Sequence, residues 1–214
     1  MALPAWSAPF AVPIGESRVV LDAPAGYADT TFTGSPRLQE LAESLTSASN
    51  RILLFALSDA DLRRFSVGDP PELRRYMVVA TPRALERERI GAAAFERLAA
   101  DAMRRFTPLP QDSDIAKALE AQPVGQASGL AELRRDPAVL SLLRGSRLAP
   151  TRIPRLFGSD ERQNFMLSSS TLMLVRGKAL ELQVFTAYES AQDAAWVRSV
   201  TARWVDELQR LNGH

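Results

Sequence analysis

Residues 172–185, with the sequence LMLVRGKALELQVF, predict a β-hairpin around which the rest of the chain can be arranged. Two apolar runs flank an Arg-Gly-Lys tripeptide, in which Gly177 can adopt the positive φ angle that a tight hairpin turn requires. In the second run apolar and polar residues alternate, with Leu180, Leu182 and Val184 on one side and Glu181 and Gln183 on the other. This strand is therefore expected to bury one face and to expose the other in part.

A long amphipathic helix is expected after the hairpin. Ser190 and Asp193 have the spacing of a capping box, which marks a helix start, and Asn212-Gly213 has the composition of a helix end. Between these signals the apolar residues advance almost wholly in steps of four, at Trp196, Val200, Trp204, Leu208 and Leu211. Such a stripe lies on one side of a helix, so both tryptophans are expected to pack on the sheet rather than to bind a ligand.

The N-terminal half predicts further strands and helices. A short strand is expected at 17–22, and the apolar run at 51–57 predicts a strand covered on both faces. Another strand is expected at 72–80. Ser35-Pro36 marks the start of one helix, and residues 90–106 have the periodicity of a second helix that packs on a core.

The combined pattern predicts an α/β (α+β) fold in which helices flank a mainly antiparallel sheet as an α/β/α sandwich. Residues 1–214 are expected to form a single globular domain. One part, at about 107–160, is expected to be an irregular Pro-rich helical insertion, with helical pieces around Ile115–Ala121 and Leu130–Leu143. Two interpretations of this insertion are equally compatible with its sequence, namely a lid or binding loop and a poorly patterned segment without a ligand.

The composition excludes most familiar catalytic sites. The chain has no cysteine, one histidine at position 214, and only two lysines, Lys117 and Lys178. Zinc sites and catalytic arrangements of Ser/His/Asp or Cys/His therefore cannot be built, and we expect neither a metal nor a cofactor. A serine within residues 168–171 activated by Lys178 is one conceivable dyad, but this run is better explained as the start of a strand.

The charge balance and the apolar pattern also exclude some partners. The formal net charge is +1, from 26 basic and 25 acidic side chains, so no overall field attracts nucleic acid. No apolar run reaches 18 residues, and no integral membrane segment is expected. The first sixteen residues carry three prolines and no basic region, unlike a signal peptide. The sequence fits a cytoplasmic protein and equally a periplasmic protein after leader removal. It gives no indication of the oligomeric state.

Two groups of residues are candidates for a ligand or substrate site. The acidic candidates in or beside the insertion are Asp112, Asp114, Asp160 and Glu161. Paired carboxylates of this kind are what a hydrolase needs, with or without magnesium. The basic candidates are Arg134, Arg135, Arg144 and Arg147. Their guanidinium groups could bind a small anion through paired hydrogen bonds.

Both ends of the chain resemble a known group of proteins. The leading strand is followed by Pro24-Ala25-Gly26-Tyr27, and the chain closes with a hairpin and a long helix that contains tryptophan. These features are similar to the α/β/α sandwiches of PsbP-type photosystem accessory proteins and of the related Ran-binding transport factors. This group includes uncharacterised bacterial members. The resemblance implies a non-enzymatic binding or assembly role, and it transfers no site residue to this chain.

Three functions follow as hypotheses. The first is a non-catalytic protein-interaction or accessory module with an unknown protein partner. The second is a carboxylate-dependent hydrolase with its site near 107–160, and the third is a binder of a small anionic ligand. The shortage of imidazole, thiol and amine groups favours the first over an enzyme.

Overall fold

The computed structural model describes residues 8–110, 113–154 and 159–213, the side chains of 152–154 and 159–162 excepted. Within these residues, seven strands form one antiparallel sheet in the order β3-β4-β5-β9-β8-β7-β6, and β1 pairs with β2 in a separate sheet. The strands are β1 (Phe10–Ile14), β2 (Ser17–Leu21), β3 (Tyr27–Asp29), β4 (Asn50–Ser58), β5 (Arg75–Pro82), β6 (Ala127–Asp136), β7 (Val139–Pro154), β8 (Ser159–Val175) and β9 (Lys178–Ala187). The helices are α1 (Pro36–Ser44), α2 (Asp59–Ser66), α3 (Ala92–Arg104), α4 (Ile115–Glu120) and α5 (Ala191–Leu211). The predicted α+β fold with a mainly antiparallel sheet is confirmed.

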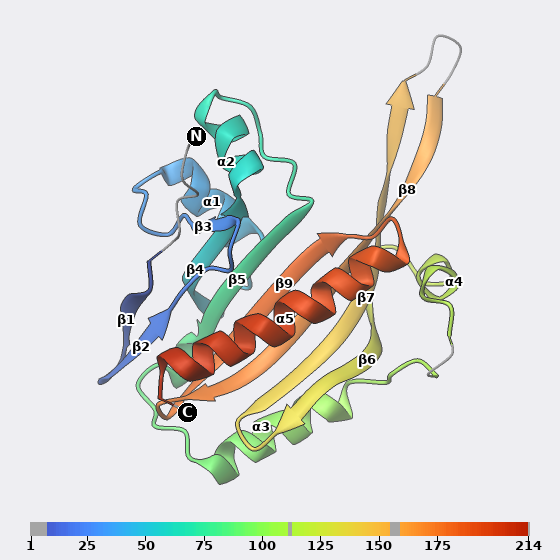
Figure 1. Cartoon of the computed structure of the whole chain (residues 1–214). Coiled ribbons are helices and arrows are strands. Elements are labelled where there is room, and N and C mark those ends of the chain that lie inside the picture. Colours follow the sequence, from blue (N-terminus) through green and yellow to red (C-terminus); the bar gives the residue numbers. More distant parts are fainter. Residues whose placement is uncertain (1–7, 111–112, 155–158, 214) are drawn as a thin grey trace.

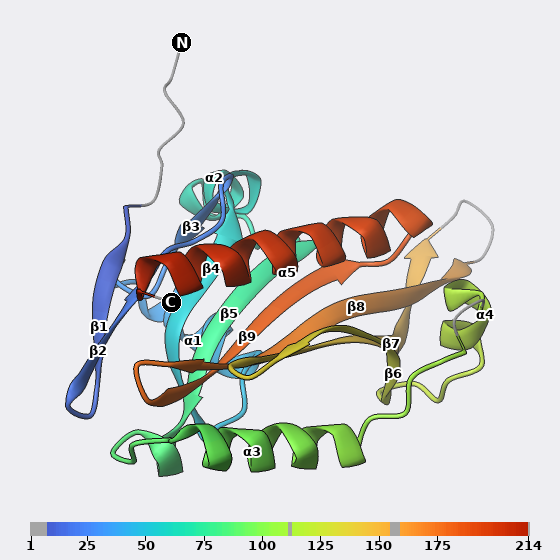
Figure 2. The same cartoon turned by 60° about the horizontal axis from the view of Figure 1, so that its bottom comes forward.

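Helices cover both faces of the large sheet (Figures 1 and 2). Helix α5 lies along one face, which we call the α5 face, together with the β1–β2 hairpin. Helices α1, α2 and α3 pack on the opposite face, which we call the α3 face. The alternation predicted for β9 produces this layering, because Leu180, Leu182 and Val184 are buried on the α5 face. Glu181 and Gln183 lie on the α3 face and are partly exposed.

The hairpin between β8 and β9 turns at Arg176 and Gly177, whose φ angles are +48° and +75°. Val175 pairs with Lys178, so these two residues alone form the loop. Positive φ at both loop positions is the backbone of a type I′ turn, whose twist matches that of the strands it joins. The predicted hairpin is confirmed, with its glycine in the turn.

Helix α5 is fastened to the sheet by its apolar stripe and by polar contacts near its end. Trp204 is 3% exposed, and its Nε1 donates a hydrogen bond to the Asp22 carbonyl oxygen at 2.8 Å. After the helix, Asn212 bonds the backbone N–H and the carbonyl oxygen of Val20 at 2.9 Å each. The capping box at Ser190 and Asp193 is present as predicted. The helix therefore joins the β1–β2 hairpin to the large sheet.

Part of the predicted helical insertion is wrong. Helix α4 confirms the piece around Ile115–Ala121, but Leu130–Leu143 lies in β6 and β7, which pair as a hairpin at the end of the sheet. Two register shifts in β6 break its alternation, so the leucines fall at spacings that imitate a helix. The hairpin loop lies between Asp136 and Val139, where a proline follows an aspartate, a turn signal that should have outweighed the periodicity.

The strands β7 and β8 are much longer than their neighbours. Pairing of β8 with β9 ends at Met166, and pairing of β6 with β7 ends at Ser146. Beyond these points β7 and β8 pair with each other as far as Pro154 and Ser159, with one further bridge between Arg147 and Val124, and form an arm that projects from the sheet (Figure 1).

The other predicted strands and helices lie close to their expected positions, whereas β3 has no counterpart in the prediction. β5 begins at Arg75, three residues later than predicted, and β1 has no counterpart in the prediction because Pro13 lies within it. A proline is compatible with a strand that pairs on one side only. Among the described helices, none has both the length and the apolar character needed to cross a membrane.

Replacing Trp204 tests the fastening of α5. We expect Trp204→Ala to lower the free energy of unfolding by about 3–5 kcal/mol, because it removes a buried ring from the α5 face. Trp204→Phe keeps most of the ring and loses the hydrogen bond, so it should cost about 1–2 kcal/mol. Urea denaturation monitored by circular dichroism measures both, with the exposed Arg203→Ala as a control. A loss below about 1 kcal/mol for Trp204→Ala would contradict this account.

Candidate functional site

The acidic candidates are not brought together by any described contact. Asp114 caps α4, where its Oδ1 accepts hydrogen bonds from the backbone N–H groups of Ala116 and Lys117. Asp160 and Glu161 lie in β8 within the arm, opposite Ile153 and Arg152, and their side chains are outside the described part. Asp112 lies outside the described residues. Among the described residues, no three His, Cys, Asp or Glu side chains form a group that could hold a metal ion.

The basic candidates are separated on β6 and β7, and three of them are already paired. Arg134 bonds Asp136 at 2.7 Å and Asp206 of α5 at 2.6 Å, which fixes it on the α5 face. Arg135 pairs with Glu132 at 2.7 Å. Arg147 bonds Gln163 and the carbonyl oxygen of Glu120. Arg144 differs from them, because its Nε is buried with no hydrogen-bond partner in the described part of the chain and its guanidinium lies over the Phe106 ring.

The serine–lysine dyad is not formed. Lys178 is buried, and its Nζ donates to the carbonyl oxygens of Glu86 and Glu88 at 2.9 and 2.7 Å. Ser170 donates to Glu181, and Ser169 shares a hydrogen bond with Thr201. The run 168–171 lies in the middle of β8 rather than at its start. Lys178 thus holds the segment before α3 against the hairpin turn.

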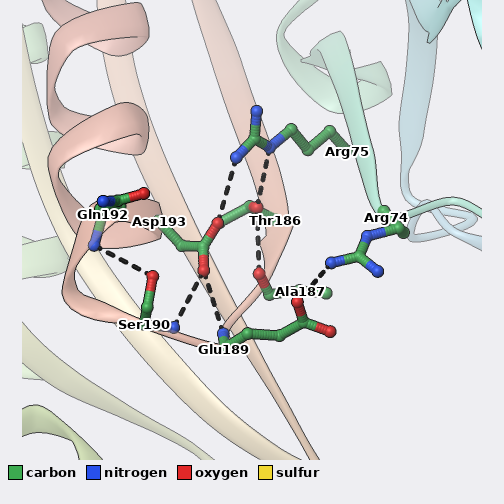
Figure 3. A network of polar contacts seen from close by, with 8 residues as sticks. All are labelled: Arg74, Arg75, Thr186, Ala187, Glu189, Ser190, Gln192 and Asp193. Carbon is green, nitrogen blue, oxygen red and sulfur yellow. Dashed lines mark hydrogen bonds and ion pairs between the residues drawn. The ribbon is translucent and has the colours of Figure 1, made fainter.

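A polar network centred on Arg75 joins β5, β9 and α5 (Figure 3). The Nε of Arg75 donates to Thr186 Oγ1 at 3.3 Å, and its Nη2 donates to Asp193 Oδ1 at 3.1 Å. The guanidinium carbon lies 4.2 Å from the centroid of the Trp196 ring. Beside it, Arg74 pairs with Glu189 at 2.6 Å. These contacts fix the start of α5 on the sheet.

Asp193 is held as a carboxylate by this network. Its Oδ2 accepts hydrogen bonds from the backbone N–H groups of Glu189 and Ser190 at 3.0 Å each. Burial raises the pKa of Asp193, but the hydrogen bonds from Glu189, Arg75 and Ser190 together lower that pKa below its ordinary value of 3.8. A carboxyl group that stays ionised at neutral pH is suited to anchoring a helix and not to donating a proton.

The network borders a polar cavity of about 340 Å³, which is also lined by Tyr27 and Asp61. Asp61 is 4% exposed and accepts hydrogen bonds from Ser58 Oγ and from the backbone N–H of Glu72. Burial raises the pKa of Tyr27, and the positive charge of Arg75 only partly opposes this shift, so the hydroxyl stays neutral. The three arginines here are paired with Glu72, Glu189 and Asp193, and Asp61 is engaged by hydrogen bonds, so each charged group already has a partner within the protein.

A second, larger cavity lies where β4 becomes an edge strand. β3 pairs with β4 only between Ala56 and Ser58. After Asp29 the chain turns away, and Phe55 is bonded instead by the Asp29 carboxylate, the Thr31 hydroxyl and the Thr30 backbone N–H. Among the described residues, Asn50–Leu54 therefore has no strand partner on the β3 side. This stretch is the free edge of β4.

The cavity beside this free edge has a volume of about 590 Å³, within the range of ligand-binding pockets. Helix α1 forms its opposite side. Its apolar lining includes Pro36, Leu38, Ala42, Ile52 and Phe55, and its hydroxyl lining includes Thr30, Thr31, Ser35, Thr46 and Ser47. Thr46 Oγ1 is buried and has no hydrogen-bond partner among the residues that the structure describes. We call this space the α1–β4 groove.

The sequence prediction missed this groove. The apolar run at 51–57 predicted a strand covered on both faces, and that is correct for its side chains, five of which in succession are buried. Burial of the faces, however, says nothing about whether the backbone edge is paired. The signal that could have revealed the edge is the segment from Asp29 to Gly34, whose Asp and Thr residues favour a turn and end β3 after three residues.

Comparisons with known proteins returned no match: no family model, no curated protein and no solved structure is significantly similar to this chain. The resemblance to PsbP-type proteins stays a prediction.

Replacing Asp193 with Asn tests the anchoring network. At pH 7 we expect Asp193→Asn to lower the free energy of unfolding by about 1 kcal/mol, the scale of a lost helix cap. Because the pKa of Asp193 is lower in the folded protein than its ordinary 3.8, the carboxylate stabilises the fold above that value and loses this effect as the pH falls through the folded-state pKa. The difference between the variant and the unmodified protein should therefore shrink from pH 5 to pH 3.

Urea denaturation at pH 7, 5 and 3 provides the measurement. Glu40→Gln, at an exposed position of α1, is the control and should show no such trend. A difference for Asp193→Asn that stays constant over this pH range would rule out the charge of Asp193 as the cause.

Proposed function

We propose that this protein is a non-catalytic interaction module that binds an extended segment of a partner protein along the free edge of β4. The observation that carries the proposal is the stretch Asn50–Leu54, which has no strand partner on the β3 side among the described residues and borders the α1–β4 groove. An unpaired strand edge offers a row of main-chain donors and acceptors, to which an extended peptide can add as a further strand.

The position of the groove between a strand edge and a helix supports this mode of binding. Main-chain bonds to β4 would supply affinity, while side chains on alternate positions of the bound segment would enter the groove towards Leu38 and Ile52. The unpartnered Thr46 Oγ1 offers one more hydrogen bond. Phe32, which is 70% exposed, follows the lining residue Thr31 and adds apolar surface close by.

The charges of the lining indicate an uncharged segment. Arg51 is engaged by Glu86 and by the Pro13 carbonyl oxygen. Arg83 donates to the Ala48 carbonyl oxygen, and Glu43 accepts from Gln39. Because each of these charged groups is already engaged by an ion pair or a hydrogen bond, the groove favours a segment with small apolar and hydroxyl side chains over an acidic or basic one.

The described acids favour this proposal over the carboxylate-dependent hydrolase. Asp114 caps a helix, Asp61 holds the turn before β5, and Asp193 anchors α5. Each thus has a structural role that accounts for its position. An interaction module also agrees with the accessory role that the resemblance to PsbP-type proteins implies.

The proposal is tested by selecting ligands from a display library of random decapeptides. We expect the selection to yield peptides of alternating apolar and hydroxyl residues. These peptides should bind the Ala48→Trp variant at least about 10-fold more weakly than the unmodified protein, because the bulky ring enters the groove from an exposed lining position. Glu40→Trp places the same ring on an exposed part of α1 outside the groove and should bind normally. Fluorescence polarisation measures these affinities.

N-methylation of the selected peptide separates strand addition from other modes of binding. An added strand bonds its neighbour through alternate peptide groups. Methylating one alternate set should therefore abolish binding, and methylating the other set should be tolerated. Failure to select any peptide, equal affinity for Ala48→Trp and Glu40→Trp, or indifference to the methylation pattern would each overturn the proposal.

A further inference from the structure

The α3 face of the sheet carries a row of four side chains, one from each of the neighbouring strands β7, β8, β9 and β5. The strand registers place Arg144 of β7 opposite Ser168 of β8, Ser168 opposite Phe185 of β9, and Phe185 opposite Tyr76 of β5. Paired residues in a sheet point to the same side. The row therefore presents a guanidinium, a small hydroxyl and two aromatic rings side by side.

This part of the α3 face is less covered than the α5 face. Along β8, Leu167, Ser169 and Thr171 on the α5 face are buried, whereas Ser168 and Ser170 on the α3 face are partly exposed. Gln183 and Phe185 on β9 are partly exposed as well. Phe185 on β9 packs against the cluster under α1, and Leu140 and Leu142 on β7 belong to the cluster under α3, so the strip over β8 lies between those two clusters.

The aromatic end of the row is a stacked pair of rings. Phe185 and Tyr76 stack with their centroids 4.5 Å apart and their planes inclined by 12°. This separation is close to the spacing of neighbouring strands, so the two rings stack along the row. The other face of Phe185 is therefore directed towards β8, where Ser168 occupies only a small volume.

The cationic end of the row lacks an anion. Among the described residues, Arg144 has neither an ion pair nor a hydrogen bond, and its Nε is buried without a partner. The Phe106 ring lies beside it, with the centroid 5.9 Å from the guanidinium carbon. Gly129 of β6, opposite Arg144, makes room for that ring, because a Cβ atom there would lie 2.7 Å from Phe106. An unpartnered buried donor is costly and rare, which points to an acceptor that the protein itself does not supply.

We infer that this strip binds a planar aromatic anion, whose ring stacks on Phe185 over Ser168 and whose carboxylate or phosphate group bonds Arg144. Phe185 and Arg144 lie two strands apart, about 10 Å, so a ring stacked on Phe185 lies over Ser168, midway between them, and its in-plane anionic group is within reach of the long Arg144 side chain. Ser168 supplies a hydroxyl group beside the ring, whereas Ser170 and Gln183 already bond the Glu181 carboxylate. This site is independent of the α1–β4 groove, so either can fail without the other.

The experiment titrates 2-naphthoate into the ¹⁵N-labelled protein and follows the backbone amides of residues 144, 168 and 185 together with the Arg144 Nε–H signal. We expect saturable shifts confined to this strip, with a Kd of about 1 mM or tighter for a ligand of this size. 2-Naphthamide lacks the charge and cyclohexanecarboxylate lacks the aromatic ring, so both should bind at least about 10-fold more weakly. 2-Naphthyl phosphate, compared with 2-naphthoate, identifies the preferred anionic group.

Two variants assign the binding to the row. Arg144→Gln should weaken 2-naphthoate binding about 10- to 100-fold, the range for a lost hydrogen bond to a charged group. Arg135→Gln, which removes an arginine of β6 that pairs with Glu132, is the matched control and should bind normally. Ser168→Leu should block the space over β8 and abolish binding even if Arg144→Gln proves unstable.

Three outcomes would overturn the inference. The first is the absence of shifts with 10 mM 2-naphthoate. The second is equal affinity of 2-naphthoate and 2-naphthamide, which would remove the role of the anion. The third is normal binding by a folded Arg144→Gln or Ser168→Leu variant.

Discussion

The two-residue periodicity of β8 and β9 is the constraint on which the rest of the structure depends. Buried residues alternate with partly exposed ones along both strands, and every buried one on β9 from Leu180 to Val184 faces α5. A shift of one residue in the register would turn this apolar set to the other face and leave α5 without a surface to pack on. The turn at Arg176 and Gly177 fixes that register, and α5 in turn fastens β1 and β2 through Trp204 and Asn212.

Both proposed binding sites lie where this arrangement leaves the sheet incomplete. One face of the sheet is closed by a long helix, but the other is shared by shorter helices that leave a polar strip over β8. At the margin of the sheet, β3 ends after three residues, and within the described part of the chain Asn50–Leu54 of β4 has no strand partner on that side. The strip over β8 exposes polar and aromatic side chains, and the free edge of β4 exposes backbone donors and acceptors. The two gaps are therefore suited to different ligands, a small aromatic anion and an extended peptide.

The sequence predicted those parts of the fold that local patterns determine. The hairpin at Gly177, the capping box at Ser190 and the stripe containing Trp204 each lie within one segment and are confirmed. The failure at Leu130–Leu143 arose because register shifts in β6 replace the strand period with an apparent helical one. The candidate sites could not be predicted in full, because an unpaired edge and a cross-strand row depend on which distant strands become neighbours. Arg144 was a candidate on its residue type alone, and only strand pairing places it beside Ser168.

The strand order has a consequence for how the chain acquires its structure. β5 pairs with β4, which precedes it closely, and with β9, which follows about half a chain length later. During synthesis the apolar strand from Tyr76 to Ala80 therefore leaves the ribosome long before its second neighbour exists, and it stays an open edge until the C-terminal third is made. The nascent protein is thus most exposed to aggregation in this interval, and a chaperone that shields β5 would act on it then.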